Sequence, residues 1–169
     1  MAKAKSGSFY IRREVDCSAT TADVVNIDTS AYVDPADRQG IMVEAVDFIF
    51  YDSATNTPFT LASTDRALGV QLLTGAYTTL QPFDEEDLVA SGGYVIDGGG
   101  GVFNAADLYP DVLGTQDGRI VVDDNMSLLG AANAAISGGN ARCAVIIKAK
   151  VVTLTNKDYM ALALQTVAN

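Results

Sequence analysis

The most regular pattern in the chain is an alternation of apolar and polar positions between Arg142 and Thr155. Apolar residues at every second position share one face of an extended strand, whereas Lys148 and Lys150 fall on the other face. The stretch is rich in β-branched residues and contains neither proline nor glycine, which favours a strand over a helix. The pattern therefore predicts a long strand with one face in a core. The apolar face consists of Cys143, Val145, Ile147, Ala149 and Val151.

Residues that tolerate a tight reversal come directly before this strand. Ser137-Gly138-Gly139-Asn140 can adopt positive φ, as the turn between two antiparallel strands requires. We therefore expect Met126 to Ile136 to pair with the long strand as a hairpin.

The segment from Ile41 to Tyr51 is a second long strand whose apolar residues change parity. Ile41 and Val43 fall on one face of a regular strand, whereas Phe48 and Phe50 fall on the other. One extra residue near Ala45-Val46 would bring both sets to the core side, so the sequence predicts a β-bulge there.

Shorter apolar segments separated by turn residues fill most of the remaining chain, and they predict an antiparallel β-sandwich. Residues 156–169 fit either an edge strand or two turns of helix. The further candidate strands are Ser8 to Cys17, Asp23 to Asp28, Leu68 to Leu73, Tyr77 to Leu80, Gly92 to Asp97 and Arg119 to Asp123.

The composition supports one folded domain over residues 1–169 that associates with partners. Hydrophobic residues make up 49% of the chain and charged residues only 19%, which excludes disorder and leaves a surface poor in charge. The net charge of −10 argues against a broad basic face for nucleic acid, so we expect weak or no direct nucleic-acid binding.

Two clusters of charge are candidate contact sites. Four of the 11 basic residues lie near the start, where residues 1–8 are expected to form a flexible basic arm. This arm is either a solvated tail or a contact to neighbouring subunits or to a polyanion. The densest acidic run is either an exposed loop or a contact to arginine or metal from a neighbouring subunit. The basic residues are Lys3, Lys5, Arg12 and Arg13, and the acidic run is Asp84, Glu85, Glu86 and Asp87.

Residues that carry common enzyme chemistry are missing. The chain has no histidine, which removes nucleophilic triads and histidine-ligated metal centres, so we expect no enzymatic activity and no cofactor. Asp123-Asp124-Asn125 shares only its composition with a calcium loop, and no metal is expected there. Cys17 and Cys143 are interpreted as buried free thiols, and a disulfide bridge between them is the alternative.

Targeting signals are not apparent in the sequence. The charged start, Met1 to Ser8, is not followed by the apolar region of a signal peptide, so we expect the chain to fold in a cytoplasm. The apolar run around Val145 is too short and too interrupted by lysine to cross a membrane.

The segment Val25 to Ile41, the bulged strand after it and the predicted closing hairpin that runs into Lys150 to Thr155 resemble a small single jelly-roll capsid protein of a tailless icosahedral virus. The resemblance implies a single jelly roll of about eight strands with long loops, and a shell built from many copies with loops at the subunit contacts. It also implies a location in the virion after folding in the host cytoplasm. The chain departs from many such proteins in lacking a long basic arm.

Three functions follow from these patterns. A self-assembling, non-catalytic capsid subunit is favoured, with copies of itself and other virion proteins as partners. Another structural or adhesive β-sandwich, such as a virion spike, tail or filament component, is the first alternative. A jelly roll that binds carbohydrate or calcium is the second.

Overall fold

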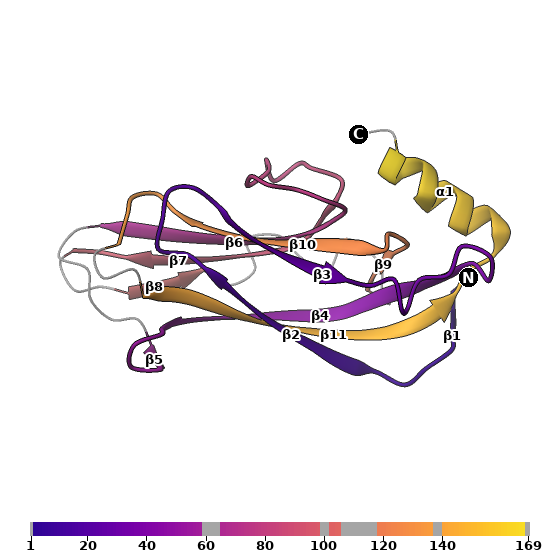
Figure 1. Ribbon diagram of the computed structural model, residues 1–169, viewed down its shortest axis with the longest axis horizontal. Helices are drawn as coiled ribbons and strands as arrows, with labels where there is room; N and C mark the ends of the chain where they lie inside the picture. Colours follow the sequence, from indigo (N-terminus) through magenta and orange to yellow (C-terminus); the bar gives the residue numbers. More distant parts are fainter. Residues whose placement is uncertain (1, 59–64, 99–101, 106–117, 137–139, 168–169) are drawn as a thin grey trace.

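The computed structural model of the chain describes residues 2–58, 65–98, 102–105, 118–136 and 140–167. Two antiparallel sheets stack as two layers, and the one helix among these residues lies at one end of the sandwich (Figure 1). The predicted antiparallel β-sandwich is confirmed.

The first layer, sheet A, has the strand order β1-β11-β4-β5, with β2 also paired to β11 and β9 also paired to β4. Because β1 and β2 pair with different parts of β11, they share one edge of it, and β5 and β9 share the far edge of β4 in the same way. The strands are β1 (Lys3–Ala4), β2 (Phe9–Asp16), β4 (Gln39–Asp52), β5 (Thr57–Pro58), β9 (Arg119–Val121) and β11 (Ala141–Thr153).

The second layer, sheet B, has the order β3-β10-β6-β7-β8. Four strands of each sheet, β2-β11-β4-β9 and β3-β10-β6-β7, form the eight-stranded, two-sheet arrangement of a jelly roll. The strands are β3 (Asp23–Asp28), β6 (Arg66–Thr74), β7 (Leu88–Ile96), β8 (Val102–Ala105) and β10 (Asn125–Ala132).

The long strand predicted from the alternation is β11, which lies inside sheet A between β4 and β2. The residues at its predicted core positions are buried, and the two lysines on the other face are only partly covered. The pattern of apolar residues therefore identified both the strand and the face that enters the core.

The predicted hairpin between residues 126–136 and the long strand is wrong. β10 pairs with β3 and β6 in sheet B, whereas β11 pairs with β4 and β2 in sheet A. Residues 137–139 of the expected turn lie outside the described residues. The physical reason is length, because the connection from Asn133 to Asn140 is long enough to cross from one layer to the other. Turn-forming residues alone do not decide which strands pair.

The predicted bulge in β4 is confirmed, and it lies at Glu44. Lys148 is opposite Ala45 and Ala149 is opposite Val43, so Glu44 is the extra residue of β4. The bulge keeps the apolar residues on both sides of it in the core and turns the Glu44 side chain toward the outer face of the sheet.

The core lies between the two sheets and depends on close approach at one glycine of β7. A Cβ atom at Gly92 would lie 2.7 Å from Cγ of Phe48, so only glycine leaves room for that ring. Nearby, the rings of Phe50 and Tyr94 stack with centroids 5.4 Å apart. These contacts join β4 of sheet A to β7 of sheet B.

The structure decides the conformation of two shorter segments, one at the C-terminus and one between β6 and β7. Residues after Thr155 form helix α1 (Asn156–Val167), which settles the helix-or-strand alternative for most of the C-terminal segment. Thr155 caps the helix, since its Oγ1 accepts the backbone N–H of Asp158 at 3.2 Å. The predicted strand from Tyr77 to Leu80 is wrong, because these residues belong to a loop between β6 and β7.

Candidate subunit-contact surfaces

The N-terminal basic residues lie against sheet A. Lys3 is opposite Thr153 in the β1–β11 pair, and the backbone N–H of Lys5 donates to the carbonyl of Val151 at 2.8 Å. The Lys5 ammonium donates to Gln39 Oε1 at 2.6 Å and lies 3.5 Å from Asp37. In this structure residues 3–6 are therefore paired to β11, and the flexibility expected of the arm stays a prediction.

Arg12 and Arg13 lie in β2, opposite Ile146 and Val145 of β11. Both side chains are exposed, but consecutive residues of a strand point to opposite faces. Measured along β11, the position of Arg12 is seven residues from that of Lys3, roughly 23 Å at the rise of a strand. The four predicted basic residues therefore do not form a single patch.

Charged side chains on the outer face of sheet A are joined at Glu44. Its carboxylate accepts a hydrogen bond from Ser8 Oγ at 2.7 Å, and it lies 2.9 Å from the ammonium of Lys150 and 3.5 Å from that of Lys148. The Ser8 hydrogen bond and the Lys150 ammonium lower the pKa of Glu44 to about 2. The cluster ties the segment before β2 to the two central strands. The predicted bulge was the only feature of the sequence that pointed to this cluster.

The acidic run does not act as one surface. Asp87 is buried, and its carboxylate accepts the hydroxyl of Tyr77 at 2.7 Å. Burial, and then the Asp87 carboxylate, raise the pKa of Tyr77. Asp84 and Glu86 are exposed and Glu85 is partly exposed, so this part of the run remains a candidate contact.

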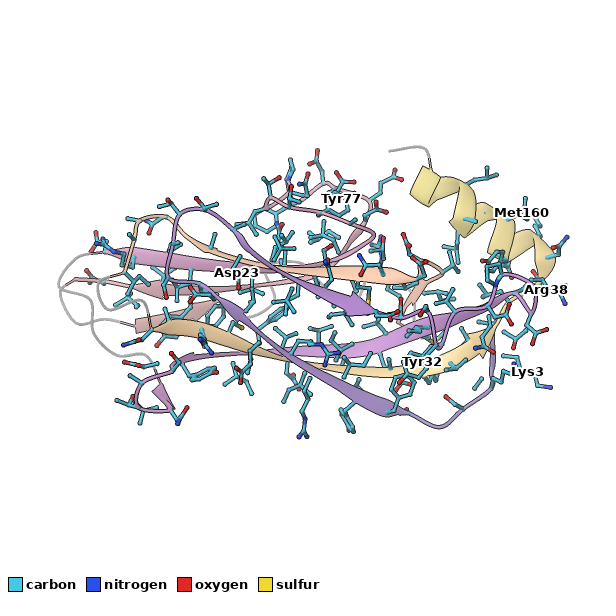
Figure 2. The ribbon with its side chains drawn as sticks, in the orientation of Figure 1. Lys3, Asp23, Tyr32, Arg38, Tyr77 and Met160 are labelled. Carbon is cyan, nitrogen blue, oxygen red and sulfur yellow. The ribbon has the colours of Figure 1, made fainter. Side chains whose placement is uncertain are left out.

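The segment of residues 75–87, here named the covering loop, lies over the outer face of sheet B (Figures 1 and 2). The buried side chain of Gln71 donates to the carbonyl of Gln81 at 2.8 Å and accepts its backbone N–H at 2.7 Å. Tyr77 packs against a second apolar cluster formed by Leu73, Leu88 and Leu129. The loop is therefore held by side-chain hydrogen bonds as well as by apolar contacts.

Large apolar side chains remain exposed at several places on the described surface. Phe83 and Leu80 project from the covering loop, and Met160 and Leu164 project from α1. Tyr10 and Ile49 lie on the outer face of sheet A. Sequence analysis did not identify the first four. Leu80 was placed in a predicted strand that does not form, and Phe83, Met160 and Leu164 lie in segments that were not assigned a definite structure.

Groups that serve metal binding or thiol chemistry are poorly placed in the part of the chain that the structure describes. No group of three or more His, Cys, Asp or Glu residues there could hold a metal ion. Both cysteines are free and fully buried, as predicted, and burial raises the pKa of Cys17 and raises that of Cys143 to about 12. Burial and the neighbouring Asp124 raise the pKa of Asp123.

The fold and its surface define a class of protein. The described residues form a jelly roll with loop and helix surfaces, and capsid proteins of viruses are among the proteins built on that fold. None of the described residues forms a helix with the length and apolarity that a membrane span requires. No family model and no curated protein sequence matches the chain.

Solved structures of viral capsid proteins are similar to the chain at low sequence identity. VP1 of KI polyomavirus, an unassembled pentamer, is 10% identical, with a TM-score of 0.51 over 92% of this chain and 98% of that one. VP1 of Washington University polyomavirus is 6% identical, with a TM-score of 0.47 over 90% and 95% of the two chains. Turnip yellow mosaic virus gives 14% identity and a TM-score of 0.41 over 90% and 95%. The first of these likenesses supports the jelly-roll assignment, and the other two scores are too low to carry weight.

Proposed function

We propose that the protein is a non-catalytic, self-assembling subunit of a viral capsid, located in the virion. The observation that carries the proposal is the shared fold, which spans nearly all of both this chain and the VP1 chain of KI polyomavirus. That protein was solved as a pentamer, so its fold supports contact between identical copies. We expect copies of this chain, with other virion proteins, as partners.

The described surface is consistent with association between copies. It carries exposed large apolar side chains on the covering loop and on α1, and burial of such side chains drives protein association. The absence of histidine and the buried state of both thiols leave carboxylates, hydroxyls and lysine amines as candidates for catalysis.

The test is to purify the full chain and to follow its state by light scattering and negative-stain electron microscopy over a range of protein and salt concentrations. Closed particles or regular rings of defined size are expected. A protein that remains monomeric under all conditions would contradict the proposal, and fibres would favour a filament component instead.

A further inference from the structure

Helix α1 is fixed to the sandwich at its base. Leu154, just before it, is buried and donates its backbone N–H to the carbonyl of Arg38 at 2.9 Å. Thr155 then caps the first turn of the helix. Beyond this base the helix lies beside the sheets and covers the outer face of neither (Figure 1).

The two sides of α1 differ in burial. Tyr159, Leu162 and Ala163 are half-buried, and Ala163 lines a hollow together with residues of the sandwich. Met160 and Leu164, one turn apart on the other side, are 52% and 63% exposed. Figure 2 shows Met160 on the helix, away from both sheets.

This exposed side of α1 combines apolar and basic character. Ala161 and Lys157 lie beside Met160 and Leu164 at helical spacing, and both are exposed. We name Lys157, Met160, Ala161 and Leu164 the outward face of α1.

The covering loop carries a surface of matching character. Phe83 is 54% exposed and Leu80 is 38% exposed, and Asp84 directly follows Phe83 at the surface. The hydrogen bonds of Gln81 to Gln71 hold this part of the loop in place. A rigid apolar surface loses little conformational entropy when a partner binds.

We propose that the outward face of α1 of one copy docks on Phe83 and Leu80 of a second copy. Met160 and Leu164 supply the apolar contact, and Lys157 faces the exposed carboxylates of the loop, Asp84 and Glu86. The occupant is a second copy because the two surfaces of this chain complement each other: both expose large apolar side chains, and the outward face carries a lysine whereas the covering loop carries exposed carboxylates.

The contact joins two different surfaces of the same chain. Contacts of this kind repeat from copy to copy, and they close into rings or shells when the rotation between copies allows it. The inference rests on the proposed function and deepens it, because it names the two surfaces that meet at one subunit contact.

A cross-linking experiment tests the contact directly. Asp84→Cys and Ala161→Cys proteins are prepared separately, mixed at a concentration at which the unmodified chain associates, and treated with a short bis-maleimide. Both native cysteines are fully buried, so the new thiols are the reactive ones. We expect a cross-linked dimer in this mixture. The control mixture pairs Ala161→Cys with Thr55→Cys, an exposed turn position, and should give at least about fivefold less dimer. Equal yields in the two mixtures would overturn the inference.

Substitutions separate this inference from the proposed function. Met160→Glu with Leu164→Glu should raise the concentration needed for assembly by roughly tenfold or more, because loss of an interface anchor costs at least that much affinity. The melting temperature of the monomer should not change, since both side chains are exposed. Ile49→Glu, at a similarly exposed residue of sheet A, is the matched control and should assemble normally.

If the unmodified chain assembles and the double variant assembles equally well, the inference fails and the proposed function stands. If the unmodified chain never associates, both fail.

Discussion

The outer faces of the two sheets differ in what lies over them. On sheet B, the covering loop shields Leu73, Leu88 and Leu129, which are fully buried. On sheet A, Tyr10 and Ile49 are 61% and 49% exposed among charged neighbours. The strands show this difference directly, since β7 and β10 are buried along almost their whole length, whereas buried and partly exposed positions alternate in β11.

The difference also bears on the contact proposed between copies of the chain. The outer face of sheet A pairs its charges within the chain, as in the cluster around Glu44, and such a face is suited to water. The covering loop and α1 also expose large apolar side chains. A loop that turns an exposed sheet face into an internal one therefore also supplies a new outer surface.

The largest expected effect on stability comes from shortening a side chain on the buried outer face of sheet B. Leu129→Ala should lower the free energy of unfolding by about 2–4 kcal/mol, as in a core, because the side chain is fully enclosed beneath the loop. Ile49→Ala on sheet A should cost less than about 1 kcal/mol. Urea denaturation of both variants measures the contrast, and equal losses would show that the two faces are equally covered.

The hydrogen bonds that hold the covering loop give the next effect. Gln71→Ala leaves the backbone N–H and carbonyl of Gln81 without this partner, at a cost of about 1–3 kcal/mol. The loop should also become more sensitive to limited proteolysis near Phe83. Gln81→Ala is the control, because Gln71 bonds the backbone of residue 81 and those bonds survive the change.

The Glu44 cluster predicts a smaller, pH-dependent effect on sheet A. The folded-state pKa of about 2 lies below the ordinary value of 4.5, so the cluster stabilises the fold above about pH 4.5 and loses that contribution as the pH falls toward 2. Because the cluster lies on the surface, we expect a contribution of about 1 kcal/mol or less. Unfolding curves between pH 2 and pH 6 should show a shallower pH dependence for Glu44→Gln than for the unmodified chain.

The smallest effect on stability is expected from the basic residues near the N-terminus. Replacing all four of them by alanine should change the melting temperature little, since their side chains are exposed and the ion pair of Lys5 with Asp37 lies at the surface. Assembly or the content of assembled particles should be impaired if these residues contact neighbours or a polyanion. Particles that are unchanged in yield and content would exclude that role. The variant combines Lys3→Ala, Lys5→Ala, Arg12→Ala and Arg13→Ala.

Strands with one buried face could be predicted from the sequence. The alternation in β11 and the change of parity in β4 are direct consequences of one apolar and one polar face, and the bulge at Glu44 followed from them. The partner of β10 could not be predicted, because its two buried faces give no alternation and a glycine-rich connection fits either a hairpin or a crossing between sheets.

The candidate contacts were predicted only in part. The sequence showed that the run from Asp84 to Asp87 is charged. The burial of Asp87, however, depends on a hydrogen bond with Tyr77, which is ten residues away. The helix at the C-terminus had a local signal in Thr155 and Asp158, a helix cap followed by an acidic residue in the first turn, and this signal was overlooked.

The neighbours of β11 have a consequence for production of the protein at high concentration. β4 is hydrogen-bonded along all 13 residues of one side of β11, and β2 and β1 divide the other side between them. Isolated apolar strands of this kind are templates for cross-β aggregation, which needs an unpaired edge. Since this long apolar strand has no open edge along most of its length, we expect many copies to accumulate in the folded state without stacking into amyloid through it.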